Sequence, residues 1–226
     1  MYAPGPKREL TLGEKWTAIG FMLLILLLFA AEILRDFHPV KLSILFVAIW
    51  HVPLLALHEA AHALAARWLG WGVRRVVIGF GRPLHKGRVR EVDVEIRLAP
   101  VLGFTVVYPR SERLPRTKHL LVYFAGPASA LLVLGAVILL VGWDDLITSS
   151  DSVGVILVQS LAIAATVDAI TNLIPMITPG PEGDFAPTDG MGMILALRRP
   201  RIWYRQQIAR WRQVEAGIMR EPTDGL

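Results

Sequence analysis

Four apolar segments, each long enough to cross a lipid bilayer, constrain the fold of this chain more than any other feature of its sequence. They lie at residues 16–34, about 42–69, about 120–141 and about 153–176. We expect the first to be an uncleaved helix rather than a signal peptide, because Glu32 and Arg35 stand where a small-residue cleavage site would lie. Of the 226 residues, 54% are hydrophobic and only 19% are charged, too little charge for a soluble domain. The predicted fold class is an α-helical polytopic membrane protein with about four transmembrane helices.

The polar stretch between the second and third segments predicts a small β-sheet or hairpin. In residues 89–98, "VREVDVEIRL", apolar and polar side chains alternate as they do in a strand with one buried face. The segments "VRRVVIGFG" before it and "GFTVVYP" after it are expected to pair with this strand, and "GRPLHKGR" is expected to form a turn. This gives a β-region at residues 73–108.

The distribution of charge predicts the topology. The stretch 70–118 contains eleven Lys or Arg against four acids, whereas "GWDDLITSSDS" contains three Asp and no basic residue. Cytoplasmic loops carry an excess of Lys and Arg, so the N-terminus, the β-region and the C-terminus are expected in the cytoplasm, in a multi-pass protein of the cell membrane. The predicted units are an N-terminal segment with the first transmembrane helix (1–41), a membrane core (42–197) and a basic amphipathic tail (198–226).

In the tail, apolar residues are interleaved with arginines: Ile202, Trp203, Ile208 and Trp211. This pattern is compatible either with a helix lying on an anionic membrane surface or with an ordinary solvated tail. Elsewhere the basic residues border apolar segments, as topology signals do, and nothing indicates a nucleic-acid partner. The chain has no cysteine, which excludes a thiol nucleophile, a disulfide framework and a Cys-based metal site.

The second apolar segment contains the motif "HEAAH", formed by His58, Glu59 and His62. Histidines four residues apart lie on one face of a helix, where they can bind one Zn²⁺ while the Glu takes a proton from a metal-bound water. His58 lies roughly 16 Å from the cytoplasmic end of its helix, and ionisable residues at such depth usually mark functional sites. The alternative is a pair of histidines in interhelical hydrogen bonds beside a neutral Glu. His51 is expected to be a hydrogen-bonding His rather than a ligand.

A catalytic zinc ion needs a third protein ligand and an open coordination position. The rest of the second segment is apolar, so the ligand must come from elsewhere in the chain. Three candidates follow in the fourth segment and after it: Asp168, Asp184 and Asp189.

The order of these motifs resembles that of the site-2 protease family of intramembrane zinc metalloproteases. "HEAAH" in a membrane helix, a small β-region, "FAGPASA" in the next segment, then "NLIP" and a later Asp-Gly are similar to the family over about residues 42–197. The resemblance implies that His58, His62 and Asp189 bind one Zn²⁺ per chain and that Glu59 is the general base. It also implies that Asn172 lines the active site, holding substrate or polarising the scissile carbonyl.

The resemblance further implies that an extended substrate pairs with an edge of the β-region, around residues 89–107. The chain departs from the family in two places. Thirteen residues, "MITPGPEGDFAPT", separate Pro175 from Asp189, where the family has only a few, so Asp184 stays open as the third ligand. This insertion is either a loop or a broken membrane segment that lines a water-filled cavity. In "GPASA", Ala130 stands where the family often has an Asn.

The predicted function is that of a hydrolase: an intramembrane zinc metalloendopeptidase that cuts the transmembrane segment of another membrane protein, as in regulated intramembrane proteolysis. Because a helix must unwind before its carbonyl reaches the metal, substrates with helix-weakening residues are expected. A regulatory membrane partner or a homo-oligomer is compatible with the sequence. The alternatives are a catalytically silent membrane scaffold or transporter that retains the protease-like core, and a membrane zinc protease that acts on soluble peptides.

Overall fold

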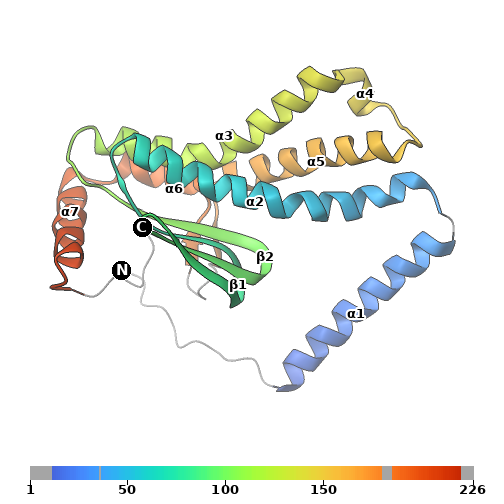
Figure 1. Cartoon of the computed structure of the whole chain (residues 1–226), viewed down its shortest axis with the longest axis horizontal. Helices are drawn as coiled ribbons and strands as arrows, with labels where there is room; N and C mark the ends of the chain where they lie inside the picture. The colour runs from blue at the N-terminus through green and yellow to red at the C-terminus, as the bar shows by residue number, and fades with distance from the viewer. Residues whose placement is uncertain (1–11, 36, 180–184, 220–226) are drawn as a thin grey trace.

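Three long helices form the centre of the molecule. The computed structural model describes residues 12–35, 37–179 and 185–219. Helices α2 (Leu42–Trp68), α3 (Pro115–Val141) and α5 (Val153–Leu173) pack against one another (Figure 1). Within the part of the chain that is described, these are the three helices long and apolar enough to cross a membrane, the first together with the 3₁₀ turn η1 (Pro39–Lys41). The predicted class, a mostly helical polytopic membrane protein, is confirmed to this extent.

The first apolar segment forms α1 (Leu12–Arg35), a continuous helix that points away from the three-helix bundle in Figure 1. The Lys41 ammonium lies 2.9 Å from the Glu32 carboxylate, which joins the end of α1 to the start of α2. A membrane crossing by α1 stays a prediction. The short helix α4 (Trp143–Ile147) connects α3 to α5 and carries two of the three aspartates of the acidic loop.

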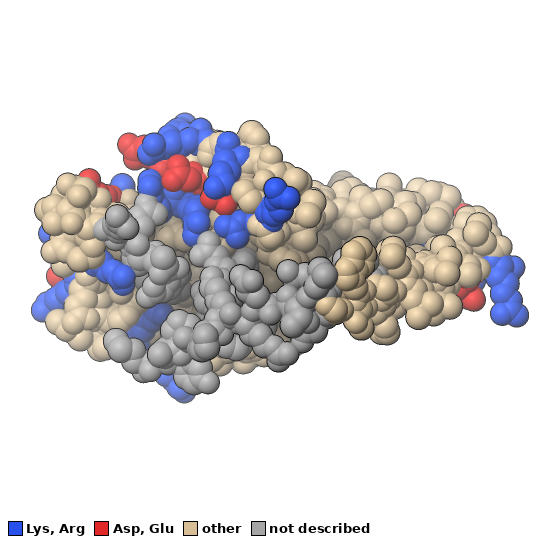
Figure 2. Space-filling model, turned by 90° about the horizontal axis from the view of Figure 1, so that it is seen from below, with Lys and Arg blue, Asp and Glu red and all other residues tan. Residues whose placement is uncertain are grey.

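Charged side chains are unevenly placed on the molecular surface. Figure 2 shows most Lys, Arg, Asp and Glu gathered around one end of the elongated molecule, while a long stretch beside them carries none. The three long helices also expose large apolar side chains, among them Ile49 on α2, Leu132 on α3 and Ile163 on α5. A protein surface that contacts the lipid of a bilayer is expected to carry exposed apolar side chains of this kind.

The β-region is one hairpin whose two long strands bend over each other. Strand β1 (Gly72–Val89) pairs with β2 (Val92–Tyr108), and Arg90 at the turn has a left-handed φ of 57°. Residues 75–78 of β1 pair with 103–106 of β2 and also with 93–96, so they lie between these two segments. The prediction of a small β-region is confirmed.

The prediction that "GRPLHKGR" forms a turn is wrong, because these residues lie within β1. Gly79 and Gly81 have φ values of +93° and +85°, a region open to glycine, and let the strand bend without ending. A side chain on Gly79 would also press on the backbone carbonyl of Ala99, so only glycine fits this crossing. The chain reverses instead at Arg90 and Glu91.

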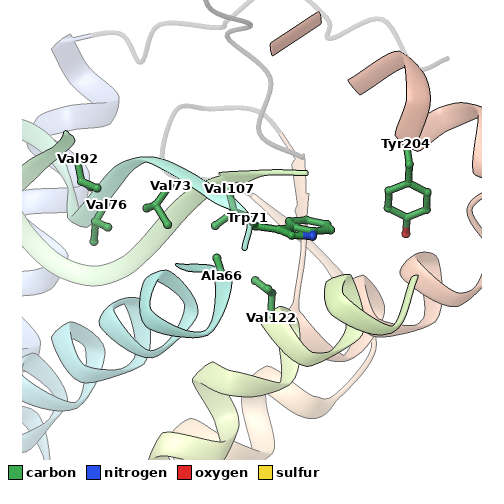
Figure 3. Packing of buried hydrophobic residues seen from close by; sticks show 8 residues of the cluster. All are labelled: Ala66, Trp71, Val73, Val76, Val92, Val107, Val122 and Tyr204. Carbon is green, nitrogen blue, oxygen red and sulfur yellow. The ribbon is translucent and has the colours of Figure 1, made fainter. Parts of the chain in front are cut away.

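A compact apolar core fixes the hairpin to the helices. In Figure 3 the valines of β1 and β2 point towards Ala66 at the end of α2 and Val122 on α3, with the Trp71 ring between them. Trp71 is 2% exposed and Ala66 is fully buried. Burial of each such valine contributes roughly 1.5–3 kcal/mol, so the hairpin is held firmly against the half of α2 that contains "HEAAH".

The tail forms α7 (Arg201–Glu215), which packs on the protein through its apolar side. Tyr204, Ile208 and Trp211 are buried. The Trp211 ring stacks on Tyr108 at the end of β2 with 4.4 Å between ring centroids, and the Tyr108 hydroxyl donates to the Glu215 carboxylate at 2.6 Å. The protein itself thus covers part of the apolar side of this docked helix, whereas Ile202 stays 56% exposed. Contact of α7 with a membrane surface stays a prediction.

Replacing Trp211 with Ala is expected to undock α7, because removal of a buried aromatic side chain costs about 3–5 kcal/mol. Trypsin should then cleave at the arginines of α7 much faster than in the wild type, as followed by mass spectrometry of the detergent-solubilised protein. Ile202→Ala is the matched control, since that side chain on the same helix is 56% exposed. Equal cleavage rates in the Trp211 variant and the wild type would contradict the docking.

Candidate metal centre

Helix α2 places His58, Glu59 and His62 on its inner side, where they are 4%, 4% and 8% exposed. The spacing of four residues puts the two imidazoles one helical turn apart, with 4.8 Å between ring centroids and the rings edge to face. Helix α3 closes this side of α2. The predicted pair of histidines therefore lies together in a buried position.

Asp189 reaches the same point from the first turn of α6 (Asp189–Arg198). One carboxylate oxygen of Asp189 lies 2.9 Å from His58 Nε2, and the other lies 3.3 Å from His62 Nε2. One donor atom from each of the three residues lies within 4.8 Å of the other two, an arrangement that could hold a metal ion. Asp184, the alternative ligand, lies outside the described residues.

The described ends of the thirteen-residue insertion pair with each other and bring the chain back to the end of α5. Strand β3 (Ile177–Pro179) pairs with β4 (Phe185–Pro187), and the Thr188 N–H donates to the Met176 carbonyl at 2.9 Å. The Thr188 hydroxyl donates to the Ile174 carbonyl at 2.7 Å and accepts from the Met191 N–H as the N-cap of α6. Helix α6 therefore begins beside the end of α5.

The glycine of the Asp-Gly pair has a steric role at this junction. A side chain on Gly190 would overlap the backbone carbonyl of Leu173 at the end of α5. Only glycine allows the first turn of α6 to approach α5 this closely. Asp189 thus supplies the carboxylate, and Gly190 allows the close packing of α6 on α5 that brings this carboxylate to the histidines.

The outer nitrogens of the two imidazoles have different partners. His62 Nδ1 lies 2.6 Å from the Val122 backbone carbonyl on α3, and His58 Nδ1 lies 3.1 Å from the Asp168 carboxylate on α5. Asp168, one of the three candidate ligands, thus contacts the His58 nitrogen that faces away from Asp189. Asn172, one turn further along α5, donates its amide N–H groups to the Asp168 backbone carbonyl at 2.9 Å and side chain at 3.2 Å.

The carboxylate of Glu59 is held by the β-hairpin. The Thr105 hydroxyl lies 2.7 Å from Glu59 Oε2, and a side chain on Gly103 would collide with Oε1. His51, two turns earlier on α2, lies 3.1 Å from the Val101 carbonyl of the same strand, in agreement with a hydrogen-bonding role. Sequence reasoning missed Thr105, Gly103 and Val122, because only the packing of β2 and α3 on α2 brings them here.

Asp189 lies outside the three apolar helices, and its charge state follows from its neighbours. Burial alone would raise the pKa of its carboxyl group, but the adjacent imidazoles of His62 and His58 outweigh this effect and lower the pKa to about 2. The group is therefore an ionised carboxylate at neutral pH, which is the form that binds a cation.

The residues fit a zinc ion in chemistry and in space. Two imidazole nitrogens and a carboxylate are a common protein donor set of catalytic zinc. Gly126 on α3 faces the donors, and a Cβ there would lie against the Nε2 atoms of both His58 and His62. Because Gly126, the glycine of "FAGPASA", has no side chain, the space beside the Nε2 atoms of His58 and His62 stays open.

A membrane protein with a buried His-Glu-x-x-His helix and a converging carboxylate belongs by fold and site to the class of metalloprotease-like membrane proteins. Residues 46–212 match the model of Peptidase family M50, and the chain belongs to this family, the site-2 proteases. The resemblance drawn from the sequence motifs is thereby confirmed.

A similar protein from Synechocystis sp. bears the name "Putative zinc metalloprotease slr1821" and is 43% identical over 56 residues. This stretch makes up 25% of the present chain and 15% of that relative, so the two are similar over a small part of their lengths.

Proposed function

We propose that this protein is an intramembrane zinc metalloendopeptidase that cuts transmembrane segments of other membrane proteins. The observation that carries the proposal is the convergence of His58, His62 and Asp189 where α6 meets the apolar helical bundle, with the Glu59 carboxylate beside them. Membership of the M50 family supports proteolysis, and the long uncharged stretch on the face seen in Figure 2 supports action within the bilayer. The catalytically silent scaffold is not favoured, because Glu59 is in place.

In this proposal His58 Nε2, His62 Nε2 and the Asp189 carboxylate hold one Zn²⁺. When bound, zinc polarises a carbonyl and lowers the pKa of water towards neutrality. Glu59 takes up the proton released from the attacking water, since Thr105 holds one of its oxygens and leaves the other without a bond to that hydroxyl. Asn172 is proposed to line the site; its amide donates to Asp168, so polarising a substrate carbonyl requires it to change partners.

The substrate is proposed to enter as an extended segment along β2. Residues 103–106 of β2 pair with β1 along one edge, and the described strands leave the other edge open to β-augmentation. Thr105 and Gly103 on this stretch contact or face Glu59, so a strand added there would run past the general base. A helix must unwind to add as a strand, which favours substrates with Gly or Pro near the cut.

The proposed topology places both termini and the β-hairpin in the cytoplasm, in a multi-pass protein of the cell membrane. The charge distribution supports it, because residues 70–118 and 198–220 carry most of the basic residues while the α3–α5 connection carries aspartates. Partners beyond the substrate, a regulator or a second copy, stay predictions.

Removal of Asp189 is expected to remove both zinc and proteolysis, because two imidazoles alone hold the ion weakly. The wild type, Asp189→Ala and Asp184→Ala are purified, their zinc is quantified, and each is reconstituted with two single-span model substrates. One substrate carries Gly-Pro in its apolar segment and the other a continuous Leu/Ala helix. We expect the wild type and Asp184→Ala to keep zinc and cut the first substrate, while Asp189→Ala does neither.

Each contrary result has one meaning. Loss of zinc in Asp184→Ala but not in Asp189→Ala would make Asp184 the third ligand. A wild type that binds no zinc would overturn the proposed function and leave the silent scaffold. Cleavage restricted to soluble peptides would replace intramembrane proteolysis by surface proteolysis.

A further inference from the structure

We infer that Asp168 is a positioning residue that orients His58 for metal binding, acting from the opposite side of the imidazole ring. Asp168 lies on α5, is 7% exposed and falls within an apolar helix long enough to cross the membrane. A carboxyl group is costly at such a place and is usually functional. The inference rests on the proposed zinc site and assigns a role that the resemblance to the family does not include.

Both carboxylate oxygens of Asp168 have partners. Oδ2 lies 3.1 Å from His58 Nδ1, and Oδ1 accepts from the Asn172 amide at 3.2 Å. The same amide also donates to the Asp168 backbone carbonyl at 2.9 Å, which ties the end of α5 to the carboxylate. The contacts run from Asn172 through Asp168 to His58, and His58 Nε2 then faces Asp189 at 2.9 Å.

This contact sets which nitrogen of His58 offers a lone pair. A neutral imidazole carries one N–H and one lone pair, and an acceptor at one nitrogen draws the hydrogen to it. Both ring nitrogens of His58 face a carboxylate, Asp168 at Nδ1 and Asp189 at Nε2. With a metal ion bound at Nε2, the carboxylate of Asp168 would keep the hydrogen on Nδ1 and leave the Nε2 lone pair to the metal. Carboxylate partners of this kind also raise the basicity of a metal-binding imidazole and fix its ring orientation.

The second histidine provides an internal comparison. His62 Nδ1 lies 2.6 Å from the Val122 backbone carbonyl, which no substitution at position 122 removes. The two ligands are therefore oriented by different means, one by a main-chain group and the other by a side chain. The support of His58 alone can be removed by mutation without touching a ligand.

Loss of the Asp168 carboxylate is expected to weaken zinc binding without changing the ligand set. The full-length protein in detergent is titrated with zinc against a chromogenic chelator, and the absorption spectrum of the Co²⁺-loaded protein is recorded. We expect about 100-fold weaker zinc binding in Asp168→Ala, at the upper end of effects known for such partners. Asp168→Asn is expected to lose about 10-fold, because its amide cannot accept from both His58 and Asn172.

The Co²⁺ spectrum at saturation should match the wild type in both variants, because the atoms that bind the metal are unchanged. Ser160→Ala is the matched control: Ser160 is fully buried on the same helix, and its hydroxyl donates only to the Ile156 carbonyl one turn away. Its zinc affinity should equal that of the wild type.

Wild-type zinc affinity in Asp168→Ala would overturn the inference. So would a Co²⁺ spectrum of altered coordination at saturation, which would make Asp168 a ligand. Should Asp168→Ala fail to fold, Asp168→Asn decides alone, and unchanged affinity there overturns the inference equally. Failure of the proposed function is a distinct result, since the wild type itself would then bind no zinc.

Discussion

Substitution of Glu59 by Gln is expected to reduce proteolysis at least 100-fold while zinc stays bound, because loss of a general base costs roughly 10²–10⁴-fold in rate. Glu59 is not among the three residues whose donor atoms converge. Glutamine has the same shape and can still accept the Thr105 hydroxyl, so the packing of β2 on α2 should survive. The measurement pairs zinc content with the rate of cleavage of the Gly-Pro model substrate in proteoliposomes.

The control for this variant is Glu32→Gln, which makes the same chemical change at an exposed glutamate on α1, away from the cluster. It should keep both zinc and cleavage. Retained proteolysis in Glu59→Gln would remove the assignment of the general base. Loss of zinc in Glu59→Gln would show instead that the Glu59 carboxylate is itself a metal ligand.

Addition of a single methyl group at Gly126 is expected to weaken zinc binding by about 100-fold, the upper end of the 1–3 kcal/mol that overpacking costs. The new Cβ would lie against the Nε2 atoms of His58 and His62, where their lone pairs converge. The ligands themselves are untouched, so the loss would come from occupied space alone. Zinc affinity of Gly126→Ala by chelator competition measures it.

Gly135→Ala on the same helix is the matched control, because nothing lies within 4 Å of the Cβ it would add. This variant should bind zinc as the wild type does. If both variants kept wild-type affinity, the metal could not lie between the two Nε2 atoms and α3, and the ligand geometry proposed above would be wrong.

The sequence predicted correctly those features that depend only on a local pattern of residues. The spacing of His58 and His62 places them on one face of any helix, and the strict alternation of residues 92–98 requires a strand. Apolar length alone predicted the helices of the bundle. These features depend on neighbours in sequence, so no knowledge of the fold was needed.

Sequence reasoning failed where two distant segments meet. From the residues alone, Asp168 and Asp189 were both candidate ligands, and the resemblance to the family favoured Asp189. That the two face opposite nitrogens of His58 depends on the packing of α5 and α6 on α2, which the sequence does not show. The misplaced turn has a similar cause. The turn was predicted from "GRPLHKGR", which begins at Gly81. In the structure Gly79 and Gly81 instead let one strand bend where it crosses its partner.

The closure of the insertion by β3 and β4 has a consequence for how relatives of this chain are found. The contact between Thr188 and Met176 makes the path from α5 to α6 short in space whatever the number of residues between them. The number of residues in this loop can therefore vary while the Asp189 carboxylate keeps its position beside His58 and His62. A pattern search that demands a fixed gap between Asn-x-x-Pro and Asp-Gly would reject this chain, whereas one that asks only for a foldable hairpin across the gap would keep it.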